Sequence, residues 1–179
     1  YTDAGLANIY KSGEGAPYVK WTANGYRLPT EAEWEKAARG GLVGKRFPWG
    51  DTISHALANY YAGGGESYDL SQGAKYHPTY ATGSQPYTSP AAAFSPNGYA
   101  LHDMAGNLWE WCWDWYSESW YANTQAIRDD TPGPTSGSYR VLRGGVWSDY
   151  AKDSRCAYRI CIAPMDASYY FGFRCVKGL

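Results

Sequence analysis

The clearest helical pattern in the chain begins at Thr30. Thr30 and Glu33 have the spacing of a capping box, in which each side chain hydrogen-bonds to the backbone N–H of the other residue. The pair Gly40-Gly41 supplies a left-handed stop. Between these signals, apolar side chains recur at i, i+3 and i+4, namely Trp34, Ala37 and Ala38. The pattern predicts a short helix that begins at Thr30, stops at Gly40 and turns one apolar stripe toward the core.

Strict alternation over residues 108–115 predicts a strand. One face of this strand carries four tryptophans, Trp109, Trp111, Trp113 and Trp115. The opposite face carries Leu108, Glu110, Cys112 and Asp114. Carboxylates in an aromatic-rich interior need cations or hydrogen-bond donors, so we expect positive charge beside this second face.

The C-terminal third predicts three short strands, at Arg140–Trp147, Cys156–Ile160 and Phe171–Val176. The pair Gly144-Gly145 indicates a bulge or the close approach of another segment. By contrast, residues 40–96 follow no period and are punctuated by glycine and proline. An irregular stretch of this length in a compact domain usually carries function or is held together by an internal ion.

Length and charge narrow the class of protein. The chain has 179 residues, with 16 Lys and Arg against 17 Asp and Glu, which is the size of a single domain over 1–179. The absence of a basic run argues against nucleic acid as a partner. No apolar run approaches the length of a membrane span, and the residues from Tyr1 onward do not have the charged-then-apolar pattern of a leader. We therefore expect no direct membrane insertion, and any export signal would lie outside this sequence.

Aromatic content is the unusual feature of the composition. Aromatic residues make up 17% of the chain, with 9 Trp and 18 Tyr. Tyrosine in excess of core needs indicates a recognition surface, because it offers a large contact area with few rotatable bonds; core aromatics with scattered surface tyrosines are the alternative. Residues 146–171 concentrate apolar and aromatic side chains without a clean period. Such a cluster, if exposed, marks an interaction site.

The cysteines and histidines do not have metal-binding spacing. The four cysteines, Cys112, Cys156, Cys161 and Cys175, contain no pair with two-residue spacing. Free thiols and a single disulfide both stay open. The three histidines, His55, His77 and His102, are scattered along the sequence, and we expect them to be structural.

Motifs along nearly the whole chain resemble the formylglycine-generating (sulfatase-modifying) family. They run in the family's order over residues 20–176: YRLPTEAEWE from Tyr26, FPWG from Phe47, PNGY from Pro96, GNLWEW from Gly106, RGG from Arg143 and GFR from Gly172. The resemblance implies an α+β, C-type-lectin-like fold with short strands, few helices and many loops. It also implies that this sequence is the C-terminal part of a longer family domain.

The family's oxidising activity is the weaker expectation. Oxidising members carry a cysteine pair shortly after the Gly-Gly, whereas Val146–Tyr150 contains no thiol. The alternative is a formylglycine-generating or related oxidase that uses Cys156 and Cys161, whose spacing is similar. However, Arg155–Arg159 matches a family segment downstream of the active pair. Reactive cysteines also need a defined electropositive pocket.

The segment 146–171 resembles the variable region of proteins diversified by bacterial diversity-generating retroelements. Every residue in it except Trp147, Lys152 and Met165 can be reached from the codon AAC by changing its two adenines, and fixed-looking residues alternate with unrelated neighbours. The resemblance implies a non-enzymatic protein at the cell surface or outside the cell that binds a protein or another surface macromolecule. The expected contacts are Ser148, Asp149, Tyr150, Asp153, Ser154, Tyr158, Ile160, Ile162, Asp166, Tyr169, Tyr170 and Phe171.

A calcium site is a further implication of the family resemblance. The stretch from Leu101 to Glu110 resembles a family Ca²⁺ site, and calcium accepts such mixed carboxylate and carbonyl oxygens. The alternative is that Asp103 caps a turn and Glu110 pairs with an arginine. Asn59-Tyr60 is similar to part of a second family site, but its downstream Asp-Gly partner is not evident. No organic cofactor is expected, and the implied calcium ligands are Asp103, Ala105, Gly106 and Glu110.

Overall fold

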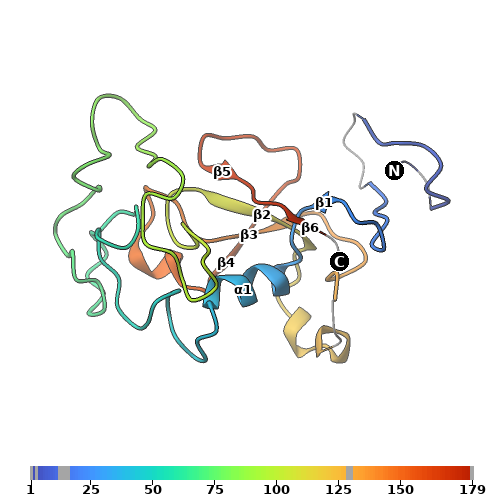
Figure 1. The fold of residues 1–179 in the computed structure, drawn as a ribbon, viewed down its shortest axis with the longest axis horizontal. Coiled ribbons are helices and arrows are strands. Elements are labelled where there is room, and N and C mark those ends of the chain that lie inside the picture. Colours follow the sequence, from blue (N-terminus) through green and yellow to red (C-terminus); the bar gives the residue numbers. More distant parts are fainter. Residues whose placement is uncertain (1, 3, 12–16, 128–130, 178–179) are drawn as a thin grey trace.

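The computed structural model describes residues 2, 4–11, 17–127 and 131–177 (Figure 1). Its α-helix and strands are short and are separated by long loops. The α-helix is α1 (Glu31–Arg39), and the strands are β1 (Tyr26–Arg27), β2 (Trp109–Trp115), β3 (Arg140–Arg143), β4 (Arg159–Ile162), β5 (Phe171–Gly172) and β6 (Val176–Lys177). Three 3-10 turns complete the set, η1 (Trp120–Ala122), η2 (Thr124–Ile127) and η3 (Ala151–Ser154). No helix in the described residues is long and apolar enough to cross a membrane.

A four-stranded sheet with the order β4-β3-β2-β5 forms the centre of the molecule. The strand β3 pairs antiparallel with both β2 and β4, while β5 adds parallel to β2. The short strands β1 and β6 form a separate antiparallel pair. In Figure 1, α1 lies below this sheet and β5 above β2. The expected α+β class with few helices and short strands is therefore confirmed.

The helix α1 forms as its sequence predicts. The Thr30 hydroxyl accepts from the Glu33 backbone N–H at 3.2 Å, and the Glu33 carboxylate accepts from the Thr30 N–H at 2.8 Å. Gly40 ends the helix with a left-handed φ of 54°. The Trp34 side chain is buried, so the helix is held by its caps and by one apolar stripe against the sheet.

The alternation of β2 gives the sheet two different faces. The face toward α1, here the α1 face, packs Cys112 of β2 and Val141 of β3 with Trp34 in one buried cluster. The opposite face, here the distal face, packs Trp109 of β2 and Leu142 of β3 with Trp147. The strand predicted over 108–115 is confirmed with this polarity.

The other three predicted strands are only partly correct. Arg140–Trp147 ends as a strand at Arg143, because Gly144 and Gly145 take φ values of 100° and 82° that break the ladder. The strand predicted at Cys156–Ile160 begins too early, since β4 begins at Arg159. Phe171–Val176 divides into β5 and β6, which belong to different sheets. The close approach expected at the glycine pair is confirmed, because a Cβ on Gly145 would lie 2.7 Å from the Ser154 Oγ.

The predicted irregular stretch is also confirmed, since residues 41–108 contain neither helix nor named strand. It has its own buried cluster, which includes Phe47, Ile53 and Tyr60. The Tyr60 hydroxyl donates to the Asp69 carboxylate at 2.5 Å, and the His55 Nε2 lies 3.0 Å from the Tyr60 carbonyl. Aromatic packing and buried hydrogen bonds thus order this stretch.

The histidines serve this packing, as expected. His55 and His77 are distant in sequence, but their ring centroids lie 5.0 Å apart, and the His77 Nε2 is 2.7 Å from the His55 carbonyl. His102 is joined to this pair through Phe94: its Nδ1 lies 2.7 Å from the Phe94 carbonyl, and the Phe94 ring meets the His77 ring edge-on at 5.6 Å. Burial lowers the pKa of both His55 and His77, which favours the neutral form of the two rings.

Candidate functional site

The distal face of the sheet carries a tyrosine cluster around the buried Trp147. The Trp147 ring centroid lies 5.7 Å from that of Tyr76 and 5.2 Å from that of Tyr87, both from the irregular stretch. It lies 6.5 Å from Tyr169 and 5.6 Å from Tyr170, which precede β5. Three separate segments therefore meet over one tryptophan, in the offset and edge-on geometries that aromatic rings prefer.

The cluster continues across the sheet as half-buried apolar side chains. The β-ladder places Ile160 opposite Leu142, and Leu142 opposite Trp111. Phe171 meets the Trp111 ring edge-on at 5.7 Å. We call this continuous surface the distal patch, and it comprises Tyr61, Tyr76, Tyr87, Trp111, Trp147, Tyr150, Tyr158, Ile160, Ile162, Tyr169, Tyr170 and Phe171.

The structure divides the twelve contacts expected from the sequence by exposure. Three are exposed: Tyr150, Asp166 and Tyr169. Seven are half-buried: Ser148, Asp149, Tyr158, Ile160, Ile162, Tyr170 and Phe171. The expectation of outward display is wrong for the other two, Asp153 and Ser154, which are 7% and 1% exposed. They belong to η3, which packs under the glycine pair, so their side chains support the segment from inside.

Asp149 is tied to the sheet at the edge of the patch. Its carboxylate accepts from the Trp109 Nε1 at 2.9 Å, and its backbone carbonyl accepts from the Tyr61 N–H at 2.9 Å. Burial raises the pKa of this carboxyl. The side chain is therefore a half-buried acceptor, and its backbone joins segment 146–171 to the irregular stretch.

The part of the patch that lies outside segment 146–171 was not predicted from the sequence. Tyr61, Tyr76 and Tyr87 come from the irregular stretch, and Trp111 comes from β2. Their positions have no local period that could link them to Trp147. The only signal is the excess of tyrosine, which predicts a recognition surface without saying where it lies.

Cys112, Cys156 and Cys161 face away from the patch. All four are free thiols. Cys156 belongs to the buried cluster on the α1 face, and Cys161 alternates in β4 with the distal residues Ile160 and Ile162. Burial raises the pKa of Cys156 to about 11.

The carboxylate expected to bind calcium has a protein partner. Arg174 donates to both oxygens of Glu110, at 2.6 and 2.7 Å, and the Trp34 Nε1 donates at 2.6 Å. Asp103 accepts from the Ala92 N–H at 2.5 Å through Oδ2. This is the arrangement given above as the alternative to calcium, and it supplies the positive charge predicted beside Glu110.

Few oxygen atoms remain at this site to bind calcium. The Asp103 Oδ1 is buried and has no hydrogen-bond partner among the described residues. The Gly106 carbonyl already accepts from the Leu108 N–H at 3.0 Å. No group of three or more His, Cys, Asp or Glu side chains in the described part of the chain could hold a metal. A calcium ion at this site stays a prediction, with Asp103 as its available carboxylate.

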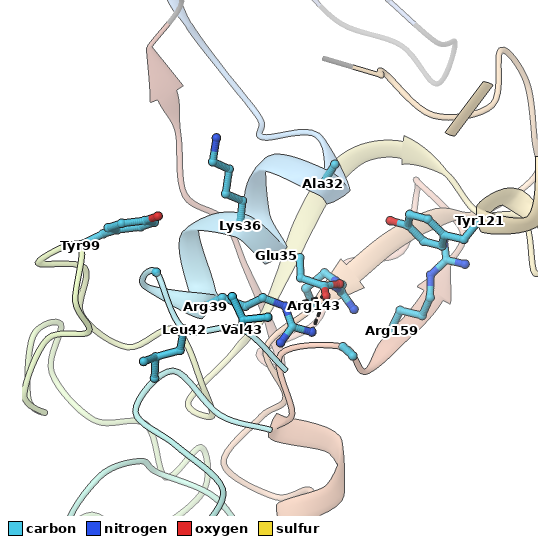
Figure 2. Close-up of a pocket in the computed structure, with 12 residues that line it drawn as sticks. Ala32, Glu35, Lys36, Arg39, Leu42, Val43, Tyr99, Tyr121, Arg143 and Arg159 are labelled. Atoms are coloured by element: carbon cyan, nitrogen blue, oxygen red, sulfur yellow. Dashed lines mark hydrogen bonds and ion pairs between the residues drawn. The ribbon is translucent and has the colours of Figure 1, made fainter. Parts of the chain in front are cut away.

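The α1 face carries a second feature, an ionic cluster of buried side chains. Glu31 and Arg143 are fully buried. Arg159 donates to both Glu31 oxygens, at 2.8 and 2.6 Å, while Arg143 donates to Glu35 and to the Tyr158 carbonyl. Beside the cluster, a pocket of about 630 Å³ opens to solvent between α1, Tyr99 and Tyr121 (Figure 2).

Comparison with known proteins identifies relatives across most of the chain. A sequence profile of the sulfatase-modifying factor enzyme 1-like domain matches residues 12–179. A formylglycine-generating enzyme from Thermomonospora curvata is 42% identical over 168 residues, which cover 90% of this chain and 52% of the relative. An inactive Cα-formylglycine-generating enzyme 2 from Bos taurus is 37% identical and is matched over 90% of this chain and 46% of its own length.

A solved structure extends the comparison to the fold. Variable protein 1 from Treponema denticola superposes with a TM-score of 0.63 at 33% identity, covering 87% of this chain and 49% of that protein. The C-type-lectin-like scaffold expected from the sequence is therefore confirmed. The chain spans about half the length of the curated relatives it matches.

Proposed function

The chain belongs to the sulfatase-modifying factor enzyme 1-like family, and we propose that within this family it is a non-enzymatic, surface-displayed ligand-binding protein. Its ligand is a protein or another surface macromolecule that binds the distal patch. The observation that carries the proposal is the collection of tyrosines over Trp147, on a face of the sheet whose described cluster contains no thiol. Aromatic side chains dominate the energetics of macromolecular interfaces.

The position of the cysteines supports binding rather than oxidation. A reactive thiol is an accessible thiolate in an electropositive setting. Cys156 is 1% exposed and its pKa is raised by burial, so at neutral pH it is a protonated core side chain. Segment 146–150, next to the glycine pair, contributes Trp147, Asp149 and Tyr150 instead of a cysteine.

The backbone of segment 146–171 is held by contacts that do not depend on its exposed side chains. The Trp147 N–H donates to the Asn107 carbonyl at 3.1 Å, and the Cys156 N–H donates to the Arg46 carbonyl at 2.7 Å. The strand β4 pairs with β3 over all four of its residues. Main-chain hydrogen bonds tolerate a change of side chain, so exposed positions can vary on a constant scaffold.

This independence supports the diversification of segment 146–171 by a retroelement. The Treponema denticola relative is named a variable protein, and we extend that property to this chain as part of the proposal. The gene's neighbourhood tests it directly. A nearby near-copy of the sequence encoding segment 146–171 that differs mainly at adenines, together with a reverse-transcriptase gene, is expected; a neighbourhood with neither contradicts the diversification.

Two matched libraries test the binding function. The first randomises four exposed or half-buried patch positions: Tyr150, Ile160, Ile162 and Tyr169. The second randomises four positions of the ionic cluster on the α1 face: Glu31, Glu35, Arg143 and Arg159. Both are displayed, scored for folding by protease resistance, and selected on immobilised proteins. We expect most members of the first library to fold and some to bind a chosen target, whereas most members of the second unfold.

Two outcomes would contradict the proposal. Equal loss of folding in both libraries would mean that the patch side chains hold the scaffold together. Turnover of a cysteine-containing sulfatase peptide that disappears in a Cys156→Ser, Cys161→Ser variant would identify the chain as an oxidase. A matched Cys112→Ser variant reports whether any loss comes from disturbing the core, because Cys112 belongs to the same buried cluster as Cys156.

A further inference from the structure

The pocket on the α1 face has walls and a floor of different chemistry (Figure 2). Its rim carries four exposed apolar or aromatic side chains, Leu42, Val43, Tyr99 and Tyr121. Val43 is 93% exposed, which is unusual for a side chain with no polar group. Exposed apolar groups gathered around one concavity are typical of a ligand site.

The floor of the pocket is positively charged. Three arginines line it, Arg39, Arg143 and Arg159, against the single carboxylate of Glu35, while the exposed Lys36 side chain points away from them. Glu31, buried beneath, supplies a second carboxylate. The three arginines therefore exceed these two acids by one. Asp114, which accepts from the Glu31 N–H, is only about half ionised at neutral pH because burial raises its pKa to about 7.

One buried donor in the floor of the pocket, the Arg143 Nε–H, has no hydrogen-bond acceptor among the described residues. Arg159 occupies both oxygens of Glu31, so the Arg143 Nε lies 3.5 Å from the nearer oxygen and makes no hydrogen bond in the described structure. Arg143 has a side-chain exposure of only 1%. A buried guanidinium donor without an acceptor is unfavourable, and negative charge in the pocket would offset the positive excess around it.

We infer that this pocket binds a small organic anion with an apolar or aromatic body and a terminal carboxylate. The body would pack against Val43 and Tyr121, with Tyr99 at the opposite side of the pocket, and the carboxylate would lie toward the guanidinium group of Arg159, because that of Arg39 is already paired with Glu35. Figure 2 shows the Tyr121 ring beside Arg159, and their centres are 5.2 Å apart. A carboxylate there accepts charge-assisted hydrogen bonds from the unused N–H groups of planar guanidinium ions.

The site is independent of the distal patch. The pocket lies on the other face of the sheet, and segment 146–171 contributes to it only Ala157 and Arg159. A matched pair of probes separates the contribution of the carboxylate to binding from that of the apolar body. N-acetyl-L-phenylalanine carries both, and N-acetyl-L-phenylalaninamide carries the body alone.

Titration of the full chain with the two probes, followed by NMR chemical shifts, tests the inference. We expect the acid to bind at least ~10-fold more tightly than the amide, with shifts at Val43 and Tyr121. Val43→Glu, which adds a carboxylate at the exposed rim, is expected to weaken the acid by at least ~10-fold. Val43→Ile is the matched control, because it adds no charge, and it is expected to keep the affinity for the acid. Tyr169→Ser changes the distal patch and is expected to leave the affinity of the pocket for the acid unchanged.

Several results would overturn the inference. Equal affinity for the acid and the amide would mean that the pocket does not recognise the carboxylate. No binding of the acid at about 10 mM would mean that the pocket is not a site for such anions. A Val43→Glu variant that binds the acid normally places the probe elsewhere. A peptide that ends in phenylalanine with a free carboxylate distinguishes two sources of the anion, because a chain terminus and a free metabolite share this chemistry. Binding of the small acid alone indicates a metabolite, and binding of both indicates a site open to a chain terminus.

Discussion

The two faces of the central sheet show what each kind of side chain does for this protein. On the α1 face, the side chains bind one another, because the buried Glu31 and Arg143 and the half-buried Glu35 and Arg159 form one ionic cluster. On the distal face, the side chains lie against a buried tryptophan and turn their other side to solvent. Main-chain hydrogen bonds hold the strands together whichever side chains lie on either face. One face of the sheet can therefore stabilise the fold while side chains on the other face change.

Breaking the ionic cluster is expected to have the largest effect. Arg143→Ala leaves the buried Glu31 with one fewer cation and the Glu35 carboxylate without its inner partner. The expected loss is about 3–5 kcal/mol in the free energy of unfolding. Urea denaturation measures it.

A conservative variant at the same position sharpens the result. Arg143→Lys keeps the charge but loses the planar fork, so its stability is expected to fall between that of the wild type and that of the alanine variant. A loss below about 1 kcal/mol for Arg143→Ala would contradict the view that the side chains of the α1 face hold the fold together.

Asp114 gives the α1 face a distinctive pH dependence. Burial raises its pKa to about 7, so the folded chain keeps this proton at pH values where the unfolded chain has released it. The contribution is stabilising at low pH and is lost as the pH rises from about 4 to 7. The loss is on the order of 3–4 kcal/mol. Thermal unfolding of the wild type and of Asp114→Asn across this range measures the difference.

The wild type must be compared with the Asp114→Asn variant because other groups titrate in the same pH range. The pKa values of His55 and His77 are lowered by burial, so they act in the opposite sense and destabilise the fold as the pH falls below about 6.5. Both proteins contain these histidines, so their contribution cancels. Identical pH profiles would mean that Asp114 does not carry the dependence.

Calcium is expected to act in the loop that leads into β2, at Asp103. A site at Asp103 that binds the folded chain alone would stabilise it by about 2.7 kcal/mol at a calcium concentration hundredfold above the dissociation constant. Melting with calcium and with a chelator measures the effect, and elemental analysis counts the ion. Asp103→Asn keeps an acceptor for the Ala92 N–H and removes the charge. A metal-free protein whose melting is unaltered would refute the calcium expectation.

The sequence predicts local structure here better than it predicts which segments meet. The capping box at Thr30 and the alternation of 108–115 are local signals, and both elements form as expected. The bounds of the later strands are less predictable, because Gly144-Gly145 and the 3-10 turn η3 change the direction of the chain in ways that no apolar period records.

The sequence predicts the half of the candidate site that lies in segment 146–171 and not the half that lies outside it. Segment 146–171 stands out by composition, but the partners of Trp147 come from an irregular stretch whose path is set by long-range packing. Burial of Asp153 and Ser154 follows from the approach of η3 to the glycine pair. That contact joins residues that no sequence pattern relates.

The smallest expected effect is the most informative about the distal face. Tyr169 is 52% exposed, and its contacts are the Tyr170 hydroxyl at 3.1 Å and the neighbouring rings. Tyr169→Ser removes these and leaves the backbone pairing of β5 intact, so the expected cost is below about 1 kcal/mol in urea denaturation. The matched control is Tyr60→Ser, where the ring is fully buried and its hydroxyl bonds to Asp69; there the expected cost exceeds about 2 kcal/mol. Similar losses at the two tyrosines would mean that the side chains of the distal face support the fold as much as buried ones do, since both substitutions remove the same ring and differ in its burial and in the hydrogen bond to Asp69.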